Sequence, residues 1–324
     1  MSLSVLFRNC SSIECHLHKS HILDEVNLLQ NRYRITGLTI SPQSHLHEAL
    51  TTADSFLEHN KDIDYTILVT DQEDFTELQK FYPSISFKCV NDINYEILNE
   101  ISEIYTELEF AYALTPFVIK HLLDKSYDQV LFLKLETLVL GKLDPLFIEL
   151  NHRSAIVTPH LLFPDISVTN INQEVDVLMA GVFNGGIVGF RNTTEALKYL
   201  NWWGQKTKSQ CFRDISNGLH FEQRWLDFIT SFIINLGVIR NAGINVAHWN
   251  LHERKLKVVN GLLYAGKDKC LVFRFSGYDE NNSKNLSIHK ADISEQNIGA
   301  AVYPFDKYKK ELHRHKVLLG TLDG

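Results

Sequence analysis

Short apolar runs alternate with longer amphipathic segments along most of this chain. Seven runs have the length of a buried strand: 35–40, 65–69, 84–90, 129–133, 154–158, 182–190 and 270–275. Two of the segments between them, 45–60 and 117–123, place apolar residues at the three- and four-residue spacing of a helix. This alternation predicts an α/β sandwich whose central sheet is mostly parallel.

The chain divides into three parts. Residues 1–34 form an N-terminal extension, residues 35–287 form the α/β domain, and residues 288–324, which are rich in Lys and His, form a helical tail. Thiol and imidazole groups in the extension could bind zinc, but their spacing is not that of a zinc finger. We therefore expect a histidine-rich surface segment at Cys10, Cys15, His16, His18 and His21.

Composition narrows the class of protein. The 324 residues are 44% hydrophobic, which is enough for a substantial core, and the net charge of -7 does not attract nucleic acid or an anionic membrane. The five cysteines are too few and too scattered for a disulfide framework, which agrees with a reducing compartment. No apolar run reaches the roughly 18 residues of a membrane-spanning helix. We expect a cytoplasmic protein with no nucleic-acid partner and no transmembrane segment.

Polar residues follow two of the predicted strands. Ser41 comes after the first strand and Asp71 after the second. An open α/β sheet binds ligands at the carboxyl ends of its strands, so both residues lie where a nucleotide could bind. Ordinary turn and helix-cap chemistry explains them equally well.

Two further patterns indicate a pocket. Gly185 and Gly186 interrupt the run 182–190, which predicts either a close approach of backbone or ligand, or a β-bulge. Asn245 and His248 lie in an otherwise apolar segment, where buried polar groups must find partners. A polar ligand would supply such partners, and so would a network that supports an irregular loop.

These segments, in this order, resemble the bacterial GT-A glycosyltransferases related to glycosyltransferase family eight. The resemblance extends over about two thirds of the chain, and no single segment decides it. It implies a GT-A fold, in which a Rossmann-like sandwich binds a nucleoside-diphosphate sugar. The segments that carry it are 35–50, 65–71, 106–133, 138–147, 180–203, 219–228, 237–256 and 271–279.

The resemblance also implies a donor-sugar pocket. Asn184 would line it with the backbone of the two glycines, and Asn245 and His248 would contribute polar groups. Glu222 stands where relatives carry an Asp that contacts sugar hydroxyls, and Gln223 keeps the amide that follows. We expect this pair at the start of an amphipathic helix, where Glu222 could instead be a solvated first-turn acid.

At two positions the chain departs from the pattern of the metal-dependent GT-A enzymes that it resembles. An Asp-x-Asp motif normally follows the strand 129–133, and here Lys134 and Glu136 occupy the two Asp positions. A His that is commonly a second metal ligand is replaced by Arg274. Because a cation beside an ammonium group is repelled, we expect no metal ion to be required. Glu136 would be the ligand if manganese or magnesium is bound after all.

The resemblance implies a hexosyltransferase-like enzyme of polysaccharide biosynthesis. It would move a sugar from a nucleoside-diphosphate sugar to the hydroxyl of a glycan, lipid-linked or protein acceptor, while Lys134 and Arg274 stabilise the departing diphosphate in place of a metal. Glu136 and Glu222 complete the candidate catalytic set. Loss of the metal positions equally fits an inactive GT-A-like protein that binds a sugar nucleotide or serves as a scaffold.

Overall fold

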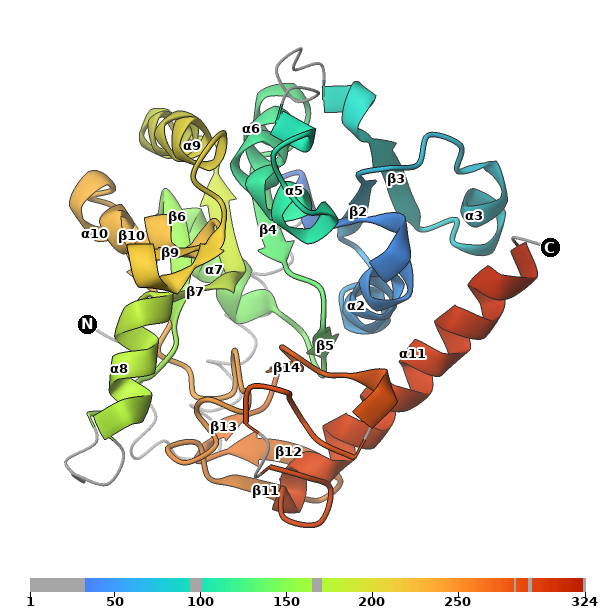
Figure 1. Ribbon diagram of the computed structural model, residues 1–324, viewed down its shortest axis with the longest axis vertical. Helices are drawn as coiled ribbons and strands as arrows, with labels where there is room; N and C mark the ends of the chain where they lie inside the picture. The colour runs from blue at the N-terminus through green and yellow to red at the C-terminus, as the bar shows by residue number, and fades with distance from the viewer. Residues whose placement is uncertain (1–32, 94–100, 165–170, 283, 291–292, 323–324) are drawn as a thin grey trace, which may run out of the picture.

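The computed structural model describes residues 33–93, 101–164, 171–282, 284–290 and 293–322. Their main feature is a seven-stranded sheet with helices on both faces (Figure 1). The Cys and His cluster of the N-terminal extension lies outside these residues. The strand order across the sheet is β10 (Leu236–Val238), β6 (Ala155–Pro159), β7 (Phe183–Arg191), β4 (Gln129–Leu133), β1 (Ile35–Ser41), β2 (Asp64–Val69) and β3 (Ile85–Cys89).

The expected mostly parallel sheet is confirmed. Strands β10 and β6 are parallel, as are β4, β1, β2 and β3, whereas β7 runs antiparallel to both of its neighbours. The run 270–275 lies outside this sheet, where β14 (Val272–Arg274) pairs antiparallel with β5 (Thr137–Val139). Direction and partner are not encoded in an apolar run, so neither feature could be read from the pattern.

Helices cover both faces of the sheet. Successive side chains of a strand point to opposite faces, and here the side chains on both faces are mostly apolar. One face packs against α5 (Glu107–Ala113), α6 (Thr115–Lys125) and α9 (Thr194–Thr207). The opposite face packs against α2 (Leu46–His59), α3 (Thr76–Phe81) and α7 (Asp144–His152). The helices predicted at 45–60 and 117–123 are confirmed as α2 and α6.

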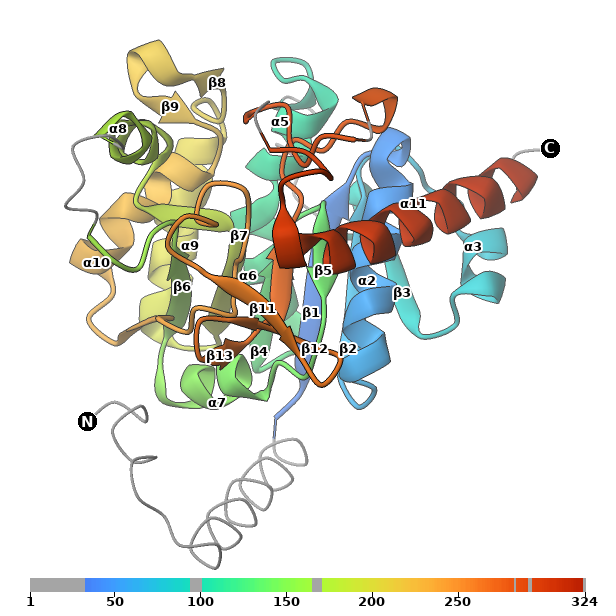
Figure 2. The same ribbon diagram turned by 90° about the horizontal axis from the view of Figure 1, so that it is seen from below.

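A smaller assembly lies beside the sheet, and the C-terminal helix is part of it. It contains a three-stranded sheet of β11 (Leu256–Val259), β12 (Leu262–Ala265) and β13 (Asp268–Lys269), together with α11 (Val302–Leu322). Helix α11 packs across α2 (Figure 2) and buries Phe305, Tyr308 and Leu312. Of the tail predicted at 288–324, the helix comprises Val302–Leu322, and its buried residues share a core with Phe273 and Phe275.

The remaining regular elements are short. They are α8 (Ile171–Ala180), α10 (Ile229–Phe232), β8 (Arg213–Asp214), β9 (Leu219–His220) and the 3-10 helices Gln43–His45, Val90–Ile93, Ile215–Asn217, Gln223–Phe228, Glu280–Asn282 and Gly299–Ala301.

Among the described residues, no helix combines the length and the apolar character needed to cross a bilayer.

One edge of the central sheet collects the candidate residues. The parallel strands end there, and the antiparallel strand β7 begins there. The pairing of β6 with β7 shifts register between Val157 and Thr158, so that Thr158 lies opposite Asn184. The Lys134 amide donates to the Gly186 carbonyl over 2.9 Å. The end of β4 and the start of β7 are therefore held side by side.

Candidate functional site

A buried ion pair lies at the end of β4. Lys134 Nζ is 2.7 Å from Glu222 Oε1, and the Glu222 side chain is completely buried. The same ammonium lies 3.5 Å from the centroid of the Tyr112 ring, a cation–π distance. Glu222 Oε2 has no hydrogen-bond partner among the described residues. The interpretation of Glu222 as a solvated acid is therefore wrong, and one of its oxygens is buried without a partner in the described part of the chain.

The amphipathic helix expected to start at Glu222 and Gln223 begins as a 3-10 helix. Residues Gln223–Phe228 form a 3-10 helix, and α10 follows directly. The Gln223 side chain faces β7, where its Oε1 accepts from the Gly185 amide over 2.7 Å. This contact holds the start of β7 against the 3-10 helix.

Asn184 is held in place by hydrogen bonds at both ends of its amide. Its Oδ1 accepts from the Gly186 amide over 2.9 Å, and its Nδ2 donates to Gln223 Oε1 over 3.2 Å. Nδ2 also lies 3.0 Å from His160 Nε2. Burial lowers the pKa of His160 to about 4, so the imidazole is neutral and can accept this bond. Sequence reasoning missed His160, although it follows strand β6 just as Asp71 follows β2.

Arg274 occupies the space beside the paired glycines. A Cβ at Gly186 would overlap the Arg274 guanidinium, and a Cβ at Gly185 would lie 2.7 Å from Glu222 Oε1. The close approach predicted at the glycines is therefore made by two of the protein's own side chains. The shift in register between β6 and β7 occurs at the same place. The disturbed strand pairing that a β-bulge predicts and the close approach, which we considered as alternatives for the glycines, are therefore both present.

The Arg274 guanidinium is buried without adequate partners. The residue is 2% exposed, and neither Nε nor Nη1 has a hydrogen-bond partner among the described residues. Burial lowers the pKa of Arg274 while the nearby Glu136 opposes that shift, but a guanidinium remains protonated throughout the ordinary pH range. Leaving such donors unsatisfied is costly, so the arrangement favours an anionic ligand.

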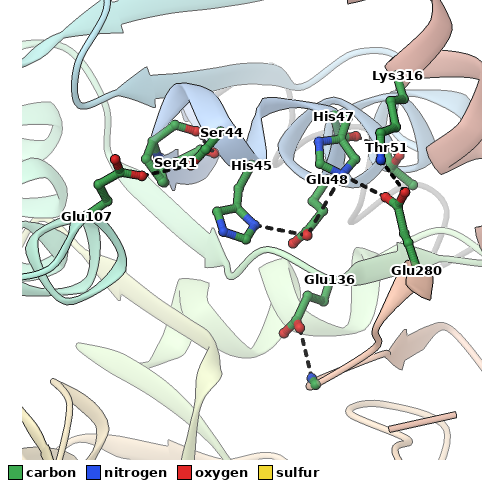
Figure 3. Close-up of polar contacts among 12 residues, drawn as sticks. Ser41, Ser44, His45, His47, Glu48, Thr51, Glu107, Glu136, Glu280 and Lys316 are labelled. Carbon is green, nitrogen blue, oxygen red and sulfur yellow. Dashed lines mark hydrogen bonds and ion pairs between the residues drawn. The ribbon is translucent and has the colours of Figure 1, made fainter. Parts of the chain in front are cut away.

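Glu136 faces Arg274 in an unusual backbone conformation. Its φ is 63°, a left-handed value that costs energy in a residue with a side chain. The Gly277 amide donates to its Oε1 over 2.8 Å (Figure 3). The Phe275 amide donates to its carbonyl over 2.7 Å. Burial, and next the charge of Glu48, raise the pKa of Glu136 to about 7. Its carboxyl is therefore partly protonated near neutral pH.

The first turn of α2 faces Glu136 across the site. His45 Nδ1 lies 3.0 Å from Glu48 Oε1, and this hydrogen bond raises the pKa of His45 (Figure 3). His47 Nε2 lies 3.0 Å from Glu280 Oε1, which joins α2 to the loop after β14. Sequence reasoning missed this group, because only its position after the first strand distinguished it from an ordinary helix start.

Ser41 and Asp71 make loop contacts. Ser41 is completely buried, and its hydroxyl donates to the Pro42 carbonyl over 2.8 Å. Asp71 Oδ1 accepts from the Gln43 amide over 2.7 Å, which fixes the loop between β1 and α2. These are the turn and cap contacts that we considered as the alternative. Their role in nucleotide binding stays a prediction.

Asn245 and His248 lie in different surroundings: Asn245 is in the protein interior, and His248 lines a cavity. Asn245 is completely buried, has a φ of 62°, and leaves both side-chain amide atoms without partners among the described residues. Asn250 donates to the Asn245 carbonyl over 2.9 Å, so the loop network exists alongside an unsatisfied amide. His248 instead lines a cavity that Leu251 and Lys290 also line.

The donor set around Glu136 does not fit a divalent cation. No group of three or more His, Cys, Asp or Glu side chains in the described part of the chain is arranged to hold a metal ion. The charged groups acting on Glu136 include the cations Arg274 and Lys134. A cation placed there would meet repulsion from both.

Known proteins with a similar fold include glycosyltransferases. No family model matches the chain. The galactosyltransferase LgtC, in complex with donor and acceptor sugar analogues, aligns with a TM-score of 0.53 at 12% identity and covers 86% of this chain and 95% of LgtC. An active-site mutant of LgtC aligns with a TM-score of 0.50 at 13% identity, covering 74% of this chain and 86% of the mutant. The chain has the GT-A fold.

Two curated relatives come from Bacillus subtilis (strain 168). The uncharacterized protein YfnF is 22% identical over 247 residues, which cover 74% of this chain and 80% of YfnF. The uncharacterized protein YfnD is 24% identical over 255 residues, which cover 77% of this chain and 80% of YfnD. These likenesses show that the sequence pattern extends along most of each relative, and they assign no activity.

Proposed function

We propose that this protein transfers a glycosyl group from a nucleoside-diphosphate sugar to an acceptor hydroxyl. The observation that carries the proposal is the buried Arg274 guanidinium, whose Nε and Nη1 lack partners among the described residues at the sheet edge where α/β proteins bind ligands. A diphosphate would supply oxygens for these donors. Stabilising the negative charge that develops on the leaving diphosphate is then the main catalytic contribution of Arg274.

Lys134 contributes differently from Arg274. Its positive charge is balanced by Glu222, so it does not add a second full charge to the site. An ammonium group has three hydrogens, and a diphosphate oxygen can accept one of those not donated to Glu222. Metal independence therefore rests mainly on Arg274, with Lys134 as a hydrogen-bond donor.

The donor sugar has hydroxyl-binding groups beside these cations. Within the described part of the chain, Glu222 Oε2 is a free acceptor, and the Asn245 amide is a free donor and acceptor. Asn184 and Gln223 hold the backbone at the start of β7 in place. We assign the sugar to this side of Arg274 and the nucleoside to the loop of Ser41 and Asp71.

The proposal is tested with a panel of sugar nucleotides. We expect at least one donor to bind at micromolar to millimolar concentration and to be slowly hydrolysed by water in the absence of an acceptor. Isothermal titration calorimetry measures binding, and chromatography of the released nucleotide measures hydrolysis. Binding without any hydrolysis or transfer would favour the sugar-nucleotide-binding alternative. No binding to any donor would contradict both.

Donor affinity should depend on pH through Glu136. Because its pKa is raised to about 7, the carboxyl loses its proton as the pH rises through 7 and then places a negative charge beside the donor diphosphate. We therefore expect the affinity for a nucleoside-diphosphate sugar, whose diphosphate charge is constant in this range, to be highest below pH 7 and to fall severalfold by pH 8. Calorimetry at several pH values measures this dependence.

The matched variant is Glu136→Gln, which cannot ionise. Its donor affinity should remain nearly constant over the same range. Deprotonation of His45 would also weaken affinity as the pH rises, so His45→Gln separates the two groups. If Glu136→Gln keeps the full pH dependence, Glu136 is not the titrating group.

A further inference from the structure

A cavity lies beside the candidate donor site. Its volume is about 420 Å³, and its lining combines apolar and cationic side chains. It is formed where the segment after β10 meets the segment before α11. The cavity is lined by, among others, the apolar residues Leu251, Leu256, Ile293 and Ile298 and the basic residues His248 and Lys290.

Aromatic contacts connect this cavity to the donor site. The His248 ring centroid lies 5.0 Å from that of Trp249, which lies 5.4 Å from that of His160. His160 in turn contacts Asn184. One tryptophan thus separates the cavity from the residues assigned to the donor sugar, so the cavity is a neighbour of that site.

A second contact ties the cavity to Glu136. The His248 ring centroid lies 5.8 Å from that of His289. The His289 ring packs against Gly277, the residue whose amide donates to Glu136. The cavity therefore adjoins the site both through Trp249 and through the loop after β14.

The charge of the cavity lining is positive. Lys290 lines the cavity and makes no ion pair with any carboxylate in the described part of the chain. Burial lowers the pKa of His248 to about 3, and the charges that add to this effect are those of His289, Lys290 and His160. His248 is therefore neutral at pH 7, and its buried Nδ1 has no hydrogen-bond partner among the described residues.

We propose that this cavity binds an anionic group of the acceptor, either a phosphate or a carboxylate. Lys290 would pair with the anion, and the neutral His248 imidazole would supply a hydrogen bond. Leu251, Leu256 and Ile298 would contact an apolar part next to it. The assignment to the acceptor rests on the proposed glycosyl transfer, whereas the anion site itself does not.

The probes are hexyl phosphate, hexanoate and the uncharged hexyl glucoside. Each is titrated into protein with labelled isoleucine methyl groups, and the resonances of Ile293 and Ile298 report binding by NMR. We expect at least one of the two anions to shift both resonances saturably, and hexyl glucoside to bind at least about tenfold more weakly, as loss of a charge-assisted hydrogen bond predicts. The anion that binds more tightly identifies the acidic group of the acceptor.

Lys290→Ala is the decisive variant, and Lys267→Ala is its control because Lys267 is exposed in the turn between β12 and β13. We expect Lys290→Ala to weaken anion binding about tenfold or more and Lys267→Ala to leave it unchanged. Equal binding of hexyl glucoside, equal binding by Lys290→Ala, or absence of binding by both anions would overturn the proposal.

Binding at Arg274 must also be distinguished from binding in the cavity. Saturating hexyl phosphate should leave the affinity for the donor sugar nucleotide unchanged, because the two ligands occupy different sites. Competition between them would place the anion at Arg274 and would overturn the proposal. If no donor binds while hexyl phosphate still shifts Ile293 and Ile298, the proposed glycosyl transfer fails and the anion site stands.

Discussion

Replacing Lys134 with Ala should lower the free energy of unfolding by about 3–5 kcal/mol, the range for breaking a buried ion pair by removing one partner. The variant leaves Glu222 completely buried and without its cation, since Nζ is 2.7 Å from Oε1 in the wild type. It also removes the ammonium from the Tyr112 ring. Urea denaturation followed by circular dichroism measures the change.

Two comparisons make this prediction specific. Lys80→Ala removes an ion pair with Glu77 in which both side chains are more than half exposed, and it should change stability by about 0.5 kcal/mol or less. The double replacement of Lys134 by Met and Glu222 by Gln should recover most of the loss, because no charge then remains buried. If Lys134→Ala is as mild as Lys80→Ala, the pair is not formed in solution.

Most of the fold could be predicted from the sequence. The strands at the seven apolar runs begin and end within about two residues of those runs. Six of the runs form strands of the central sheet, which are mostly buried and stop where polar residues begin, whereas the run 270–275 lies outside that sheet. Helix α2 followed from its apolar spacing in the same way. The antiparallel direction of β7 could not be predicted, since burial is the same for either direction.

The candidate residues could be predicted singly but not as pairs. The resemblance implied that Lys134 and Arg274 would lie near a diphosphate and that Glu222 would contact the donor sugar. It could not show that Lys134 and Glu222, which are 88 positions apart, neutralise each other. Nor could it show that Arg274 fills the space beside Gly186, because a glycine indicates room for something without naming what occupies it.

Replacing Arg274 with Ala should weaken donor binding by about 1.5–3 kcal/mol, or about 10- to 150-fold, the range for hydrogen bonds to a charged group. The guanidinium is the cation of this site that lacks both a carboxylate contact and partners for two of its nitrogens in the described part of the chain. Arg274→Lys should recover part of the affinity, since an ammonium keeps the charge but not the planar donors. Calorimetry with the donor found in the panel measures the effect.

The control is Arg240→Ala, because Arg240 is an exposed arginine beyond the end of β10. It should leave donor affinity unchanged. Circular dichroism should show that Arg274→Ala remains folded under the conditions of the titration. Donor affinity that is equal in Arg274→Ala and wild type would remove Arg274 from the diphosphate site.

Replacement of the metal ion by Arg274 is tested by measuring the donor affinity of the wild type in excess EDTA and in excess manganese. If Arg274 takes the place of a metal ion, the affinity should be the same in both and should fall only in Arg274→Ala. Binding that disappears in EDTA, returns with manganese and is unchanged in Arg274→Ala would contradict the account and would place a metal ion at Glu136.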